Sequence, residues 1–398
     1  FVLTLLFGNG IIQSMRTSDK KVYMDYAATT PVDERVFGAM RPYFCDTFGN
    51  ADSVHSFGRD AAVAVDDARR RIAALMGATR TEIYFTSGGT EADNWAVKGG
   101  ALAASAVGRK KIVISAIEHP AVTESAMFMR KLGFEVVRVP VDGQGRVRPE
   151  DVGKVADGGT AIVSVMLANN EVGTVQPVAE IAKIAHDAGA LFHTDAVQAA
   201  GGMRLDVKAL GADMMTISSH KFYGPKGCGA LYVKKGITIE PLISGGHQER
   251  GARGGTTNVA AVVGMAEALA LTYERLDEDR ARVSSLRDEF VEQLLAKVSN
   301  ARVNGGGEML PGHANIMLPG VDGRALLPLL DMAGVACSLG SACSSGSVDP
   351  SPVLLAMGLR EADTRSSVRF SLGRYTTADD VAYAADAVAA AWRKLSEN

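Results

Sequence analysis

Two reactive side chains stand in turn-forming segments of the sequence. Lys221 lies in residues 218–227 (SSHKFYGPKG), directly after an apolar run. A lysine that acts as a Schiff-base nucleophile needs partial burial and positive neighbours to lower the pKa of its amine. Cys343 lies in residues 338–347 (SLGSACSSGS), where small polar neighbours favour an exposed loop and a reachable thiol. Taken singly, Lys221 could equally be a solvated charge beside a turn, and most unpaired cysteines are buried as small hydrophobes.

Two further segments suit a phosphorylated aromatic cofactor. Residues 85–92 (FTSGGTEA) follow an apolar run and open a helical stretch, so backbone N–H groups at the start of a helix could hold a phosphate. Asp195 ends another apolar run, and a buried aspartate paired with the pyridine nitrogen of pyridoxal phosphate (PLP) keeps that nitrogen protonated. Each segment also has a plain alternative, namely an ordinary strand-to-helix turn and a helix-capping aspartate.

Short β-branched runs alternate with helical stretches through the first two thirds of the chain. The runs cover residues 82–85, 111–115, 161–165, 190–193 and 215–218, and a helix is expected over 178–188. Continuous apolar runs of this length are typical of buried parallel strands, with the helices as crossovers. The pattern predicts an α/β fold with a central, mostly parallel sheet.

After about residue 275 the sequence pattern changes. It predicts a long charged helix over 274–295, a turn at 305–307 and then shorter helices and strands. We expect a large PLP-binding domain over 30–274 and a smaller α+β domain from 15–29 and 275–398, with the active site between them. Residues 1–14 are apolar, begin without Met and contain Gly8, Asn9 and Gly10, so they are interpreted as a leader or an upstream artefact.

Composition excludes several classes of protein. The 398 residues carry a formal charge of −3, with 47% hydrophobic and 22% charged residues, and no basic footprint for nucleic acid. No run is long enough to span a membrane. Cys45, Cys228 and Cys337 stand in apolar or glycine contexts and are expected to be structural, without CxxC pairs or metal-ligand spacing. We expect a cytoplasmic protein that binds neither nucleic acid nor membranes directly.

The joint occurrence of these segments with several others resembles the cysteine desulfurases of the IscS/NifS type. The further segments are DYAATTP at 25–31, FGN at 48–50, Glu118-His119, NNEVG at 169–173 and RFSLGR at 369–374. The resemblance runs from about Val22 to the C-terminal helix. It implies a PLP-dependent transferase of fold type I, with a seven-stranded, mostly parallel sheet between helices, assembled as a homodimer.

The resemblance also implies roles for individual residues. Lys221 would hold PLP covalently, Asp195 would pair with the pyridine nitrogen, and His119 would stack on the ring. Gln198 and Asn170 would hydrogen-bond the side of the ring, and Arg369 would bind the substrate carboxylate, for which a planar guanidinium is suited. The phosphate would be held by Gly89, Thr90, Ser218 and His220, with Thr256 supplied by the second subunit.

The expected reaction converts L-cysteine to L-alanine and leaves the sulfur on Cys343 as a persulfide. A sulfur-acceptor protein, such as an iron–sulfur scaffold or a tRNA-thiolation protein, would then receive it. Three alternatives stay open: an aminotransferase for a small amino acid, a selenocysteine lyase, and an inactive relative kept as an interaction platform. A thiol in a flexible loop argues against the aminotransferase, and a platform would need neither Lys221 nor Cys343.

Overall fold

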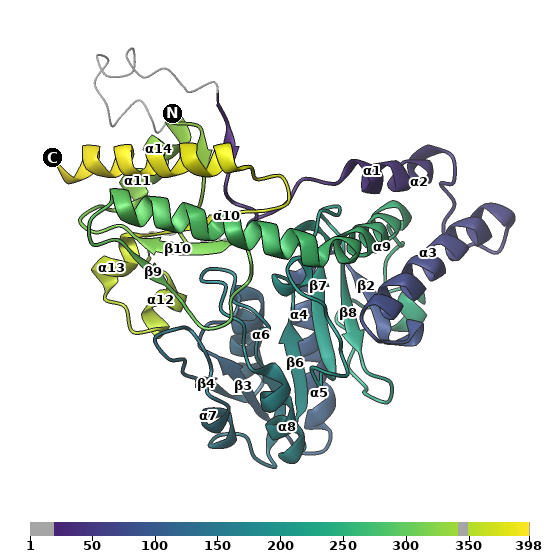
Figure 1. Ribbon diagram of the computed structural model, residues 1–398. Coiled ribbons are helices and arrows are strands. Elements are labelled where there is room, and N and C mark those ends of the chain that lie inside the picture. The colour runs from purple at the N-terminus through teal and green to yellow at the C-terminus, as the bar shows by residue number, and fades with distance from the viewer. Residues whose placement is uncertain (1–19, 341–348, 398) are drawn as a thin grey trace.

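The computed structural model describes residues 20–340 and 349–397 (Figure 1). Its largest element is a seven-stranded sheet with the order β2-β8-β7-β6-β5-β3-β4, in which only the pairs that include β8 are antiparallel. The strands are β2 (Ile83–Thr86), β3 (Lys111–Ser115), β4 (Glu135–Val139), β5 (Thr160–Ser164), β6 (Leu191–Asp195), β7 (Met214–Ser218) and β8 (Gly229–Val233).

The direction of the strands brings distant segments to one edge of the sheet. Strands β3, β5, β6 and β7 are parallel neighbours, and β2 shares their direction because both β2 and β7 run antiparallel to β8. The carboxyl ends of all five strands therefore lie at the same edge, which is where α/β sheets bind their ligands.

Helices cover the sheet and connect its strands. In the large part of the chain they are α1 (Glu34–Met40), α2 (Pro42–Cys45), α3 (Ser56–Leu75), α4 (Gly89–Asn94), α5 (Gly100–Ser105), α6 (Pro120–Arg130), α7 (Pro149–Gly153), α8 (Val178–Asp187) and α9 (Val259–Glu274). Short 3-10 turns lie at Arg80–Glu82, Ala199–Gly201, Ser219–Lys221 and Gln248–Gly251, and a π-helical turn at Trp95–Gly99 joins α4 to α5. Among the described residues, no helix has the length and apolar character needed to cross a membrane.

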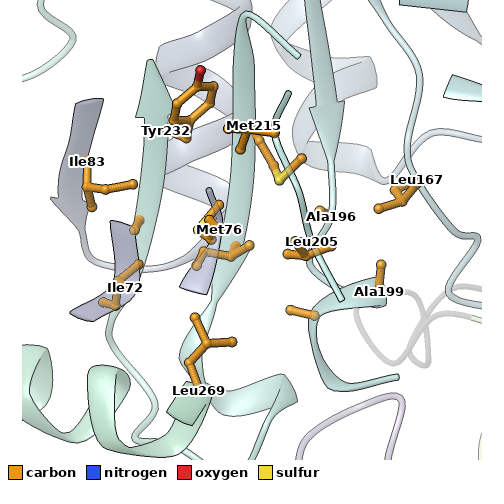
Figure 2. Packing of buried hydrophobic residues seen from close by; sticks show 14 of the residues in the cluster. Ile72, Met76, Ile83, Leu167, Ala196, Ala199, Leu205, Met215, Tyr232 and Leu269 are labelled. Atoms are coloured by element: carbon orange, nitrogen blue, oxygen red, sulfur yellow. The ribbon is translucent and has the colours of Figure 1, made fainter. Parts of the chain in front are cut away.

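The main core lies between the sheet and the helices on one of its faces. Figure 2 shows Ile72 from α3, Met76 at its C-terminal end, Ile83 from β2, Met215 from β7 and Leu269 from α9 pointing into this core. All of these side chains are at most 1% exposed. A second cluster on the other face packs Trp95 of the π-helical turn between β-strand side chains and α6. Burial on both faces explains why the strands read as continuous apolar runs.

A smaller part of the chain has its own core and two small sheets. One pairs β1 (Val22–Tyr23) with β11 (Val335–Ala336) in parallel, and the other has the antiparallel order β12-β10-β9, formed by β12 (Ser367–Ser371), β10 (His313–Met317) and β9 (Arg302–Asn304). Its helices are α10 (Leu276–Lys297), α11 (Gly323–Met332), α12 (Pro352–Ala356), α13 (Glu361–Arg365) and α14 (Ala378–Ser396). Helices α10 and α14 pack along one another (Figure 1).

The predicted α/β class, with seven mostly parallel strands, is confirmed. The five predicted runs correspond to β2, β3, β5, β6 and β7 within two residues, and the helix expected over 178–188 is α8. The helix expected over 274–295 differs at its start, because Arg275 has a non-helical backbone (φ −107°, ψ 6°) and separates α9 from α10. The division into two domains at this point stays a prediction.

Candidate active site

One cavity at the carboxyl edge of the sheet gathers residues that end or follow β2, β3, β5, β6 and β7. Its wall contains ten of the residues predicted from the sequence, together with Ala27, Ala28, Asp93, Met166 and Val197. The ten are Gly89, Thr90, His119, Asn170, Asp195, Gln198, Ser218, His220, Lys221 and Arg369. The sequence therefore identified most of the lining, and it is the strand order that brings these residues together.

Lys221 enters the cavity from a short turn after β7. Its Nζ donates hydrogen bonds to the carbonyl oxygens of Ala27 (2.5 Å) and Ala28 (2.8 Å). The turn that follows is strained, because Tyr223 has φ 67°, a conformation that non-glycine residues rarely adopt. Tyr223 is fixed on both sides: its N–H donates to Thr30 Oγ1 (2.9 Å), and its hydroxyl accepts from the N–H of Arg374 (2.6 Å).

The glycines after β2 leave room for an anion at one end of the cavity. Gly88 has φ 153°, and a Cβ on Gly89 would lie 2.8 Å from Val197 Cγ2, so both positions require glycine. His220 lines the same end and shares a 3.1 Å hydrogen bond with Thr29 Oγ1 through its Nδ1. Burial, together with the positive charges of Lys221 and Lys226, lowers the pKa of His220 to about 4. His220 is therefore neutral at neutral pH and can donate or accept a hydrogen bond.

The other end of the cavity carries buried carboxyl groups. Asp195 is 5% exposed and accepts a hydrogen bond from the N–H of Val197 (2.8 Å). Burial raises the pKa of Asp195, while His119 and Lys221 act in the opposite direction. A cationic nitrogen placed against this carboxylate would offset the cost of burying its charge.

Asp93 is a cavity residue that sequence reasoning missed. Its side chain is buried, and Oδ1 has no hydrogen-bond partner in the described part of the chain, with His193 Nε2 3.7 Å away. Burial and the neighbouring Asp195 hold the pKa of Asp93 well above its usual range. A usable signal was present, because Asp93 follows Gly89 by four residues and so lies one helical turn beyond it.

His119 and Gln198 are held in place by the backbone. His119 is the N-cap of α6, and its Nδ1 accepts a hydrogen bond from the N–H of Ala121 (3.1 Å), which places the ring proton of the neutral form on Nε2. Gln198 donates from Nε2 to the carbonyl oxygen of Ala27 (2.9 Å), the same oxygen that Lys221 contacts. Both side chains thus have fixed orientations at the wall of the cavity.

Arg369 on β12 brings a fully buried cation to the cavity from the smaller part of the chain. Its guanidinium donates from Nη1 to the carbonyl oxygen of Asn170 (3.1 Å) and from Nη2 to Asp25 Oδ1 (2.8 Å). Its Nε–H has no acceptor among the described residues. An unpaired buried donor is costly, and the oxygen of a bound ligand would satisfy it.

Cys343 lies outside the described residues, but both flanks of its segment are attached beside the cavity. On one side Ser338 exchanges two backbone hydrogen bonds with Arg369 (2.7 and 3.1 Å). On the other, Ser351 donates from Oγ to Glu171 Oε2 (2.6 Å) and is the N-cap of α12 ahead of Pro352. The chain therefore leaves and re-enters the described structure next to Arg369 and the 169–173 segment.

Thr256 and the three other cysteines discussed from the sequence lie outside this cavity. Thr256 is exposed and does not line the cavity of its own subunit. Cys228 is buried, with its pKa raised to about 12 by burial, and burial also raises the pKa of Cys337. Cys45 is exposed, unlike the buried position that is usual for a structural cysteine. Among the described residues, no group of three or more His, Cys, Asp or Glu side chains could hold a metal ion.

The residues of this cavity fit PLP. A glycine-lined end suits the phosphate, a buried carboxylate suits the pyridine nitrogen, a lysine suits the aldehyde carbon, and the unpaired Nε–H of Arg369 suits an amino-acid carboxylate. The carboxylate and the guanidinium come from β6 and β12, and the lysine comes from the 3-10 turn that follows β7.

Comparisons with known proteins agree with this arrangement. The family described as Aminotransferase class-V matches residues 22–383. The cysteine desulfurase IscS of Dictyoglomus turgidum is 46% identical over 94% of this chain and 95% of its own length. The cysteine desulfurase IscS of Methanosarcina thermophila is 44% identical over 93% and 91%, respectively.

Solved structures of related proteins are also similar to this chain. A NifS-like protein superposes with a TM-score of 0.88 at 36% identity, covering 93% of this chain and 99% of that one. The structure of SspA in complex with cysteine has a TM-score of 0.78 at 33% identity, covering 90% of this chain and all of the other.

Proposed function

Because the chain belongs to the class-V aminotransferases and, within them, to the PLP-dependent cysteine desulfurases of the IscS/NifS type, we propose that L-cysteine reacts in the cavity described above, with Lys221 and Cys343 as the reacting groups. The observation that carries this assignment is the convergence of Lys221, Asp195, His119 and Arg369 on one cavity. The same residues argue against an inactive protein that serves only as an interaction platform, because such a protein would need none of them.

PLP, when bound, withdraws electrons from the Cα of the attached amino acid. In the proposal, Asp195 holds the proton on the pyridine nitrogen, His119 packs on the ring, and the Gly89 end binds the phosphate. Arg369 binds the substrate carboxylate and so fixes which Cα bond faces Lys221. The freed amine of Lys221 then removes the Cα proton and later returns protons to the carbon skeleton.

Sulfur transfer is assigned to Cys343. Its thiolate attacks the sulfur of the substrate, an S–S bond forms, and the C–S bond breaks with its electron pair going to Cβ. Protonation of that carbon gives L-alanine, and the sulfur stays on Cys343 as a persulfide. A sulfur-acceptor protein, such as an iron–sulfur scaffold or a tRNA-thiolation protein, completes the cycle by attack on the outer sulfur. We place the reaction in the cytoplasm.

We also propose that the active form is a homodimer. Apolar side chains are exposed along α1, α2 and α3 and the connection between them, and two more lie in the segment that leads to Thr256. They are Phe37, Phe44, Phe48, Val54, Phe57, Val63, Leu242 and Ile243. An exposed apolar surface of this kind is typical of a subunit interface. The exposed position of Thr256 agrees with a phosphate contact made in the other subunit's cavity.

The reaction is tested by mixing the PLP-loaded protein with L-cysteine and a reductant and measuring alanine and sulfide in the same sample. We expect equal amounts of the two products, because each C–S bond broken yields one of each. Pyruvate or a transaminated product in place of alanine would instead support an aminotransferase. A protein that retains no PLP after reconstitution would contradict the proposal altogether.

A further inference from the structure

Asp25 contacts the guanidinium of Arg369 without lining the cofactor cavity. The Asp25 carboxylate accepts from Arg369 Nη2 through Oδ1 (2.8 Å) and from Ser338 Oγ through Oδ2 (2.8 Å). Its backbone is tied to β12 on both sides, because Ser371 donates to the carbonyl of Met24 (2.8 Å) and Tyr26 donates to that of Ser371 (3.2 Å). Asp25 is therefore fixed against Arg369, and it is not among the residues that line the cavity.

The ion pair changes what Arg369 offers to a ligand. The Arg369 side chain is 1% exposed and that of Asp25 15% exposed, so water screens the pair weakly. A carboxylate that approaches the Nε–H, which has no acceptor within residues 20–340 and 349–397, meets an ion pair with no net charge rather than an isolated cation. At the separations of neighbouring side chains, the repulsion from Asp25 offsets a large part of the attraction to Arg369.

We propose that Asp25 is a positioning and specificity-determining residue that orients Arg369 while weakening the binding of substrate and product carboxylates. The proposal rests on the proposed role of Arg369 as the carboxylate-binding residue. Through this arrangement the site recognises a carboxylate by hydrogen-bond geometry, and L-alanine leaves without having to separate from an uncompensated buried cation.

The decisive variant is Asp25→Asn in the full chain loaded with PLP. Asparagine keeps the shape, can still accept from Arg369 and can donate to Ser338 Oγ, but it removes the negative charge. L-alanine and L-alaninamide are titrated separately while the visible absorption of the cofactor is followed. We expect the Kd for L-alanine to fall about tenfold and the Kd for L-alaninamide, which has no carboxylate, to stay within about twofold.

Asp33→Asn is the matched control for loss of a buried ion pair. Asp33 is buried and contacts Arg374 Nη1 (3.3 Å) and Arg35 Nη2 (2.8 Å), but it does not line the cofactor cavity. The Asp33→Asn substitution should lower the melting temperature of the protein without changing the Kd for L-alanine or for L-alaninamide. An unchanged or raised Kd for L-alanine in the Asp25→Asn protein would overturn the inference.

Arg369→Lys separates this inference from the proposed function. If it leaves the Kd for L-alanine unchanged, the carboxylate site itself is wrong, and the role of Asp25 is refuted with it. If it weakens L-alanine but Asp25→Asn does not tighten it, only the role of Asp25 is refuted. Should Asp25→Asn fail to fold, Ser338→Ala frees Oδ2 of Asp25 and should weaken L-alanine about threefold relative to L-alaninamide. Equal effects on both ligands would then refute the inference.

Discussion

At the scale of single residues, the proposed chemistry depends on two groups, the amine of Lys221 and the thiol of Cys343. Lys221 is partly buried and bound to two backbone carbonyls of the 25–31 segment, which hold its Nζ beside the cavity. Cys343 belongs to a segment whose flanks are attached at Ser338 and Ser351. The fold thus positions the lysine, whereas Cys343 lies outside the described residues, between these two attachments.

Replacing Cys343 by serine should separate binding from sulfur transfer. The hydroxyl cannot take up sulfur, so we expect the colour of the cofactor and its response to L-cysteine to persist while alanine formation falls to background. Alanine release is measured by chromatography. Cys45→Ser, which removes an exposed thiol elsewhere, serves as the control and should retain full activity. Ordinary turnover by the Cys343→Ser protein would remove this thiol from the mechanism.

Replacing Lys221 by alanine should abolish covalent attachment of the cofactor. After reduction with borohydride, mass spectrometry of the wild-type protein should find the cofactor mass on the peptide that contains Lys221 and on no other. The variant should show no modified peptide. If borohydride still fixes PLP to the variant, another lysine forms the link and the assignment of Lys221 is wrong.

At the scale of elements, the active site is built from strand ends and the turns that follow them. Asp195 ends β6 and Lys221 follows β7, and both strands are completely buried except for the first residue of β6. Gly89 starts the helix after β2 and packs against Val197, which follows β6. Close packing between these turns leaves little freedom for the cavity wall to adjust to a larger side chain.

Replacing Gly89 by alanine tests this packing. The new Cβ would lie 2.8 Å from Val197 Cγ2 and 3.5 Å from Ser218 Cβ, so one turn must shift at the expected phosphate end. We expect the Kd for PLP, measured by titrating the apoprotein, to rise at least about tenfold, a loss of about 1.4 kcal/mol. Gly158→Ala is the control, since its Cβ would meet no atom within 4 Å. Equal PLP affinity in both variants would contradict a phosphate site at this turn.

At the scale of the whole molecule, the exposed apolar surface on α1 to α3 supports the proposal that the active form is a homodimer. Phe48 and Phe57 are 65% and 55% exposed, and their ring centroids lie 5.8 Å apart. Such aromatic pairs are enriched in the buried centre of protein interfaces. The surface accordingly favours an obligatory partner over a transient one.

Phe57→Asp should break the proposed homodimer. A charge at the centre of the interface would be buried without a partner, so we expect monomers in sedimentation-velocity experiments, together with weaker PLP retention. Val107→Asp, a change at a 75% exposed valine in the turn after α5, should leave the dimer intact. A wild-type protein that sediments as a monomer, or a Phe57→Asp protein that stays dimeric, would refute this interface.

The amino-acid sequence by itself determined the class of the fold, and it also predicted the reactive groups, which stay a prediction. Buried strands must be apolar on both faces, so β2, β3, β5, β6 and β7 were visible as short apolar runs. Segments such as 85–92 and 218–227 carry their chemistry within a few consecutive residues. By contrast, β4, which is largely exposed, and β8 were not singled out from the sequence, although β8 is as apolar and buried as the other strands. The break at Arg275 was also missed.

Only the tertiary structure decided which residues meet. Asp25 reaches Arg369 because β1 and β12 belong to the same part of the fold, although the two residues lie 344 positions apart along the chain. Local periodicity reports whether a side chain is buried but not which side chain it faces. Contacts between distant residues follow from strand order and packing, and these depend on the energy of the whole chain.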